Sequence, residues 1–179
     1  AVSLEANGPV WEDSCVEIFL SVPGKEGYYN FETNCIGTSL AAYRRSKTDA
    51  DMFGPEQMEQ IGTVASLAHE TIDIQKEGQE WSMLKIIPFS LLGLSETPAT
   101  LKGNFYKCGD CCAQPHFLSW SPIDLPQPNF HCPEFYIELI SGNKDGVIAV
   151  VIFRGRRKAQ CGVDHTPPVF SLSLSDFNF

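Results

Sequence analysis

Apolar and polar positions alternate along much of the chain, which is the pattern of short strands with one face in a core. In residues 15–22, for example, Val16, Ile18 and Leu20 share one face, whereas Glu17 lies on the other face with apolar neighbours. Similar runs occupy residues 28–36, 38–45, 62–69, 80–87, 101–107, 134–140 and 147–153, and an alternating stretch closes the tail. We therefore expect a mostly β protein whose first three strands form an antiparallel meander.

One or two short helices are expected between the strands. The polar loop 46–61 contains a Gly-Pro pair, so a helical turn is expected at residues 55–60. The sequence "IPFSLLGL" places Pro88 at the first turn of a second short helix and Gly93 near its end. Trp81, inside an alternating run, is expected in the core.

Residues 108–133 are rich in proline and cysteine and show almost no periodicity. Long irregular segments are uncommon inside a compact domain, and they are more often binding loops than plain connections. We therefore interpret this segment as a binding loop.

Length and composition indicate one folded domain, which we place at residues 1–179. The apolar fraction of 43%, the charged fraction of 20%, the 14 glycines and the 12 prolines are typical of a loop-rich globular protein. The seven cysteines are an odd number, so at least one thiol is unpaired within a monomer. They leave the compartment open between a secreted or periplasmic protein and a cytoplasmic one.

The charge balance narrows the classes of partner. With 22 acidic and 13 basic side chains, the formal net charge of −9 repels the phosphates of nucleic acid and an anionic membrane surface. No apolar stretch is long enough to span a membrane. We expect neither nucleic acid nor membrane as a partner, and a neutral ligand fits this charge better.

Three groups of segments, in this order and at these separations, resemble the family 9 carbohydrate-binding modules, particularly free-standing family 9-like proteins of gut bacteria. They are "GPVWEDSCVEIFLSV" with "YYNFETNCIG", then "IPFSLLG", then "LKGNFYKCGD" leading into "PHFLSWSPIDLPQPNFHCPEFYIEL". The resemblance covers about residues 8–140. It implies an antiparallel β-sandwich of the jelly-roll or DOMON-like kind that binds a mono-, oligo- or polysaccharide without catalysis.

The resemblance also implies the residues of an aromatic sugar slot. Trp11 would form one wall and Trp120 the opposite wall, while Glu17 accepts hydrogen bonds from sugar hydroxyls. Arg44 or Arg45 would supply the donors. Together with two further polar candidates for the rim, the expected ligand-binding residues are Trp11, Glu17, Asn34, Arg44, Arg45, His116 and Trp120. Other carbohydrate-active enzymes are candidate partners of such a module.

A row of polar residues adds to this picture. Asn30, Glu32 and Asn34 recur at every second position, so they project from one face of a strand. That row could bind sugar hydroxyls or face water, and the sequence leaves both open.

The tail departs from the family pattern. Family members have additional strands before the first matched segment, whereas here "HTPPVFSLSLSDFNF" near the end resembles one of those strands. We therefore expect the tail, residues 141–179, to complete the sandwich in permuted order.

Other chemistries stay open as alternatives. Cys108, Cys111, Cys112 and His116, with Cys132 later, could form a zinc-stabilised structural or interaction domain, or a local disulfide. A cysteine nucleophile with His116 or His131 would make an enzyme, and carboxylate pairs could make a glycoside hydrolase. The candidate carboxylates are Glu17, Glu32, Asp110 and Glu134.

No cofactor is required by the sugar-binding interpretation, but structural calcium is an open alternative. Asp49, Asp51, Asn143 and Asp145 supply the oxygen ligands that this hard ion prefers, although they do not form an EF-hand loop.

Overall fold

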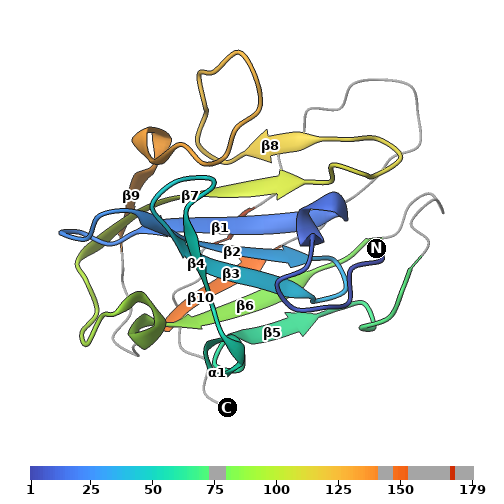
Figure 1. Ribbon diagram of the computed structural model, residues 1–179, viewed down its shortest axis with the longest axis horizontal. Coiled ribbons are helices and arrows are strands. Elements are labelled where there is room, and N and C mark those ends of the chain that lie inside the picture. Colours follow the sequence, from blue (N-terminus) through green and yellow to red (C-terminus); the bar gives the residue numbers. More distant parts are fainter. Residues whose placement is uncertain (73–79, 141–146, 153–169, 172–179) are drawn as a thin grey trace.

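The computed structural model describes residues 1–72, 80–140, 147–152 and 170–171 as two antiparallel sheets (Figure 1). The first sheet has seven strands, in the order β4-β3-β2-β1-β7-β8 with β9 also paired to β7. Its strands are β1 (Cys15–Ser21), β2 (Tyr28–Asn34), β3 (Ser39–Arg44), β4 (Ala50–Met52), β7 (Thr100–Cys108), β8 (Phe117–Ser119) and β9 (Ile137–Ile140).

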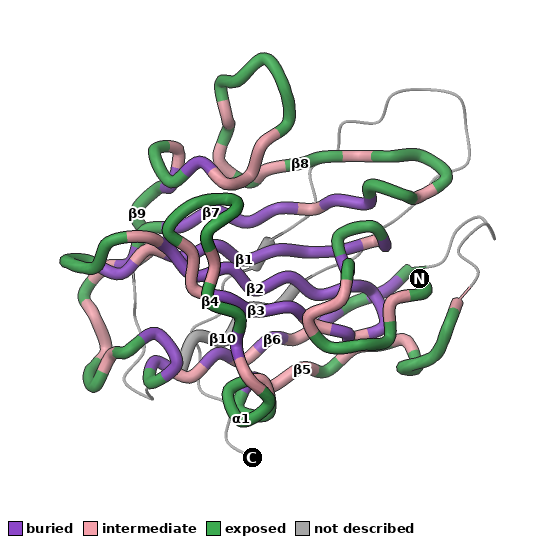
Figure 2. The backbone as a smooth tube through the Cα atoms, in the orientation of Figure 1, coloured by how far each residue is buried: buried purple, intermediate pink, exposed green. Residues whose placement is uncertain are grey.

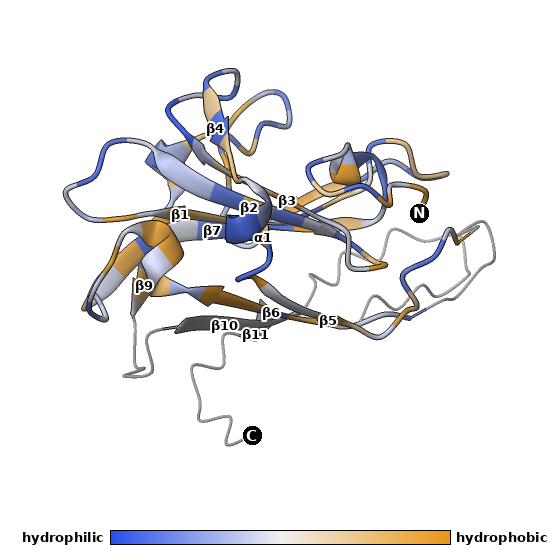
Figure 3. Cartoon of the chain, turned by 60° about the horizontal axis from the view of Figure 1, so that its bottom comes forward, coloured by the Kyte–Doolittle hydropathy of each residue, from blue (hydrophilic) through white to orange (hydrophobic). Residues whose placement is uncertain are grey.

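The second sheet has four strands in the order β11-β10-β6-β5, and Figure 3 shows the two sheets as separate layers. Its strands are β5 (Gly62–Ala65), β6 (Met83–Pro88), β10 (Val147–Ile152) and β11 (Phe170–Ser171). The helical elements are η1 (Val10–Glu12), α1 (Pro55–Met58), η2 (Phe89–Leu92) and η3 (Pro133–Phe135). Among the described residues, none of these helices is long and apolar enough to cross a membrane.

This architecture confirms the expected mostly β, antiparallel sandwich with short helices. The predicted meander is confirmed, because β1 pairs with β2 and β2 pairs with β3. The predicted helical turns are α1 and the 3-10 helix η2, which ends at Gly93 with a left-handed φ of 73°. At this angle a residue with a Cβ is strained, so glycine suits the helix end.

Sequence reasoning missed two short edge strands and placed two strand starts three residues early. The polar loop 46–61 contains β4, and the irregular segment 108–133 contains β8. The strand expected from residue 80 is β6, which begins at Met83. The strand expected from Glu134 begins instead at Ile137, because Pro133 opens the 3-10 helix η3.

The main core lies between the two sheets and follows the alternation in the sequence. Val16, Ile18 and Leu20 of β1 all face this core, where they join aromatic side chains from neighbouring strands such as Phe31 and Phe105. Trp81 is buried against the same cluster, as expected.

The opposite face of the first sheet, here called the outer face, is buried as well. Two segments cover it, and the central strands are therefore buried along most of their length (Figure 2). At one end, Val10 of η1 packs on Cys15 and Cys108. Toward the other end, the segment 121–136 packs on Phe19, Tyr28 and Tyr106, and the ring centroids of Phe130 and Tyr106 are 4.2 Å apart.

The tail supplies β10 and β11 to the second sheet, where β10 pairs with β6 along its whole length. The other tail residues, 141–146, 153–169 and 172–179, lie outside the described residues. The permuted order of the tail relative to other family members stays a prediction.

Candidate functional site

The centre of the outer face is polar, unlike its two covered ends. Glu17 of β1 lies directly opposite Glu32 of β2 in the register of the sheet. Asn30 is two residues from Glu32 on β2. Ala42 of β3 lies opposite Asn30, and Arg44 is two residues beyond Ala42. Because alternate residues of a strand share a face, all four project from the outer face.

Hydrogen bonds connect three of these side chains in series. Arg44 Nε donates to Asn30 Oδ1 over 2.9 Å, and Asn30 Nδ2 donates to Glu32 Oε1 over 2.6 Å. Arg44 Nη1 also donates to the carbonyl of Lys47 over 2.8 Å. Arg44 is half-buried, whereas Asn30 and Glu32 are buried. This series of hydrogen bonds therefore leads from a half-buried guanidinium to a buried carboxyl group.

The two opposed carboxyl groups are difficult to ionise together. Burial raises the pKa of Glu32 to about 7, although nearby Arg44 and the hydrogen bond from Asn30 lower it. Burial and then the charge of Glu32 raise the pKa of Glu17 well above its usual value. Glu17 Oε1 also accepts a hydrogen bond from Cys108 Sγ over 3.0 Å. The site can thus offer both protonated and ionised carboxyl groups near neutral pH.

Aromatic side chains border this polar centre on the side of the segment 121–136. Tyr28 Oη and His131 Nδ1 are 2.8 Å apart, and the His131 ring lies 5.0 Å from the ring of Phe19. Burial lowers the pKa of His131 to about 4, so its imidazole is neutral at physiological pH. This edge of the site is therefore aromatic and uncharged.

Comparison with known proteins decides the family. The model of carbohydrate-binding family 9 matches residues 1–140, which is most of the chain. The chain belongs to carbohydrate-binding family 9.

A solved structure is similar to this chain in sequence and fold. It is the crystal structure of a protein from Bacteroides uniformis ATCC 8492 that is proposed to bind carbohydrate, and its sequence is 41% identical to this chain. The TM-score is 0.72, and the match covers 78% of this chain and 66% of that one, just under two thirds. No curated protein matches the chain.

Of the residues that the family 9 resemblance implied, Trp11 belongs to η1, which covers one end of the outer face. It follows Val10, whose side chain packs on that face, and 36% of Trp11 is exposed. The Trp11 carbonyl accepts a hydrogen bond from the amide of Asp110 over 3.1 Å, which holds η1 against the loop after β7.

Trp120, the other expected wall of the slot, packs differently. Its amide donates to the carbonyl of Phe105, and its ring meets the Phe105 ring edge-on at 5.4 Å. Phe105 points into the core between the sheets, whereas Glu17 is on the outer face. The structure therefore does not bring the Trp120 ring and Glu17 to the same face of the first sheet.

The two candidate arginines also separate. Arg44 lies on the outer face, but Arg45 is exposed and forms ion pairs of 2.7 Å with both Asp49 and Asp51. These pairs lower the pKa of both carboxyl groups and occupy the oxygens that were candidates for calcium. The other calcium candidates, Asn143 and Asp145, lie outside the described residues.

Asn34 and His116 have structural contacts. Asn34 is buried, and its amide group donates to the Ser3 carbonyl and to Asp13, so it fixes the N-terminal segment on the sheet. His116 Nε2 lies 2.8 Å from Lys107 Nζ.

The four zinc candidates of the loop do not meet around one point. Cys111 is exposed, Cys112 and His116 are half-buried, and the thiol of Cys108 points instead to Glu17. Sequence reasoning had no signal for the partners found here, because Cys15 stands in an apolar run far from Cys108 in the chain.

Proposed function

We propose that this family 9 chain binds a carbohydrate, without cleaving it, at the polar centre of the outer face. The observation that supports this most strongly is the hydrogen-bonded chain from Arg44 through Asn30 to Glu32. Sugar hydroxyls need donors and acceptors in fixed positions. A guanidinium donates in a rigid plane and a carboxylate accepts, so the hydrogen-bonded side chains of Arg44, Asn30 and Glu32 can meet both requirements.

An aromatic wall beside the polar groups would complete the site. Trp11 is only partly covered, and an indole is the largest flat apolar surface among the side chains. The C–H face of a pyranose would lie on this ring while its hydroxyls reach Arg44 and Glu32. Trp120 is not assigned to this site, because its ring packs against the core-facing Phe105.

The charge of the site favours a neutral sugar. Asp110 contributes to raising the pKa of both Glu17 and Glu32, so three acidic groups act on this region. An acidic saccharide would meet repulsion there, in addition to the net charge of −9 for the whole chain.

A glycan-array screen followed by calorimetry tests this proposal, with Trp11→Ala and Trp120→Ala as a matched pair. We expect a neutral sugar whose affinity falls roughly tenfold or more in Trp11→Ala, a loss of about 1.4 kcal/mol. Trp120→Ala should bind within about twofold of wild type. Unchanged binding in Trp11→Ala would contradict the proposal, and equal losses in both variants would favour a slot between the two rings.

Glycoside hydrolysis is the competing function, and the direct opposition of Glu17 and Glu32 is the observation that favours it. The selected oligosaccharide is incubated with and without the protein, and the release of reducing sugar distinguishes hydrolysis from binding alone. Binding without release of reducing sugar supports the proposal. Release of reducing sugar by the wild type that disappears in Glu32→Gln would contradict the proposal and assign glycoside hydrolysis instead.

A further inference from the structure

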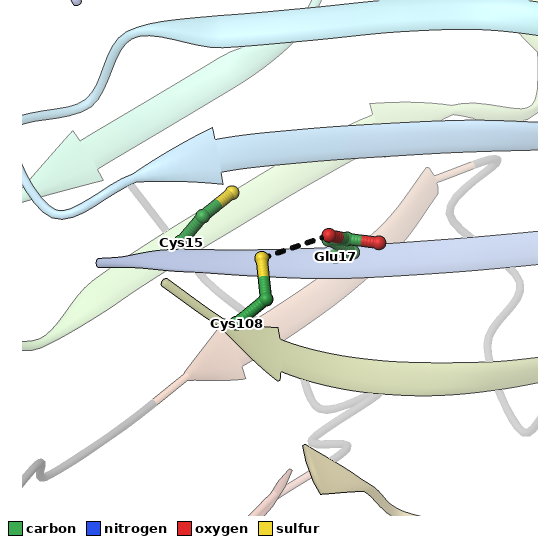
Figure 4. A group of neighbouring side chains, drawn as sticks. All are labelled: Cys15, Glu17 and Cys108. Atoms are coloured by element: carbon green, nitrogen blue, oxygen red, sulfur yellow. Dashed lines mark hydrogen bonds between the residues drawn. The ribbon is translucent and has the colours of Figure 1, made fainter. Parts of the chain in front are cut away.

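Three buried side chains with metal-binding atoms meet on the outer face, beside the proposed sugar site. Cys15 and Glu17 project from β1, and Cys108 projects from β7 directly opposite Cys15. Their two sulfurs and one carboxylate oxygen all lie within 4.8 Å of one another, and no other group of three such donors is this close among the described residues. Figure 4 shows the two sulfurs and the carboxylate converging on the same side of the two strands.

The hydrogen-bond pattern of the strands separates a metal site from a disulfide. The Ser14 carbonyl accepts from the Cys35 amide, so it points to the side of β2. Successive residues of a strand point their backbone groups to opposite neighbours, so those of Cys15 point to β7. Cys15 and Cys108 are therefore a hydrogen-bonded pair, the class in which opposed side chains are farther apart.

This pair is wide for a disulfide and suitable for a bridging ion. A disulfide holds its Cβ atoms about 3.8 Å apart, whereas opposed Cβ atoms of an antiparallel pair are about 4.5–5.5 Å apart, with the shorter value in pairs that are not hydrogen-bonded. A tetrahedral zinc ion with Zn–S bonds of about 2.3 Å holds two sulfurs about 3.8 Å apart and needs no sulfur–sulfur bond. The pairing of β1 with β7 therefore favours two thiolates that bind one ion over a disulfide.

Apolar side chains enclose the thiols. Val10 and Leu40 pack against Cys15 and Cys108 in one apolar cluster, and Phe130 contacts its edge. Such a shell excludes water and strengthens the attraction between a cation and its anionic ligands.

The three donors carry complementary charge once an ion is bound. A coordinated thiol loses its proton, and a divalent cation neutralises the charges of the two sulfurs and the carboxylate, which lie within 4.8 Å of one another.

We propose that Cys15, Glu17 and Cys108 form a three-ligand site for a soft divalent metal ion, with zinc as the best fit. Two thiolates and one carboxylate are a zinc donor set, and a fourth position stays free for a small ligand. Such an ion would fasten β1 to β7 beneath η1. Glu32 would then be the carboxylate that remains for the sugar.

Zinc-edge X-ray absorption on protein purified under reducing conditions tests the site directly. We expect one zinc per chain with two sulfur neighbours at about 2.3 Å and oxygen neighbours at about 2.0 Å. Replacement by Co²⁺ should give the thiolate charge-transfer absorption of a tetrahedral site, and Cys15→Ser and Cys108→Ser should each abolish it.

The double variant Cys111→Ser/Cys112→Ser is the matched control, because these cysteines lie in the loop just after Cys108. It should keep one metal per chain, and Arg44→Ala should keep it as well. Absence of zinc from the wild type, a zinc ion without sulfur neighbours, or loss of metal in the loop variant would each overturn the proposal. A Cys15–Cys108 disulfide found by mass spectrometry in the reduced preparation would also overturn it, and the wild-type absorption spectrum decides the question even if a Cys→Ser variant fails to fold.

Discussion

Lys85 of β6 donates a hydrogen bond from Nζ to Ser39 Oγ of β3 over 2.6 Å, so it links the two sheets across the interior. Its other partner is Thr63 Oγ1 at 2.9 Å. Both partners are uncharged hydroxyls, and only 1% of Lys85 is exposed. Burial lowers the pKa of Lys85 from its usual value to about 7.

Lys85 should make stability depend on pH. Between pH 7 and the ordinary lysine pKa, the unfolded chain binds this proton and the folded chain does not, so the free energy of unfolding rises with pH. We therefore expect Lys85→Met to stabilise the protein at pH 6 more than at pH 10. Urea unfolding at both values measures this, and a Lys85→Met effect that is the same at both would contradict the assignment.

The N-terminal segment should depend on Asp13. Its carboxylate accepts from the amides of Val2 and Ser3 and from Asn34 Nδ2, at 2.9–3.1 Å. Asp13→Ala leaves the amides of Val2 and Ser3 without this partner and removes one of the two acceptors of the buried Asn34 Nδ2, so we expect a loss of about 1–3 kcal/mol in the free energy of unfolding. Asp124→Ala, at an exposed loop position, is the control and should change stability by less than about 0.5 kcal/mol. Equal effects of both substitutions would contradict this role.

Asn104 should hold the segment 121–136 over the outer face. It is buried in β7, and its side chain exchanges two hydrogen bonds with the backbone of Ser121, at 2.9 and 3.0 Å. We expect Asn104→Ala to speed amide hydrogen exchange across 121–136 while the amides of β2 keep their protection. The exposed Gln127→Ala is the control. Unchanged exchange in Asn104→Ala would show that packing of this segment on the sheet is sufficient.

Much of the fold could be predicted because alternation is a local signal. The phase of Val16, Ile18 and Leu20 gave the core face of β1 correctly. The three-residue strands β4 and β8 could not be found this way, since they are held by backbone pairing to β3 and β7 rather than by a side-chain pattern. Their existence depends on neighbours that are distant in the chain.

The candidate site was harder to predict because it depends on register. Arg44 and Arg45 look equivalent in the sequence, and only the pairing of Arg44 with Tyr28 assigns Arg44 to the outer face. Trp120 stands in a segment without periodicity, so no local pattern in the sequence indicates on which face of the sheet its ring packs. Asn34 projects from the predicted face, but its contact with Asp13 is a property of the folded N-terminal segment.

The account is tested most directly by calorimetric titration of the selected sugar into Arg44→Ala and Arg45→Ala. The two arginines are adjacent in the chain, and both substitutions remove one positive charge, but only Arg44 reaches Asn30 on the outer face. Removing a charged hydrogen-bond donor costs about 1.5–3 kcal/mol, so Arg44→Ala should weaken binding roughly ten- to a hundredfold while Arg45→Ala binds like the wild type. Full affinity in a folded Arg44→Ala variant, or a loss confined to Arg45→Ala, would contradict a sugar site on the outer face.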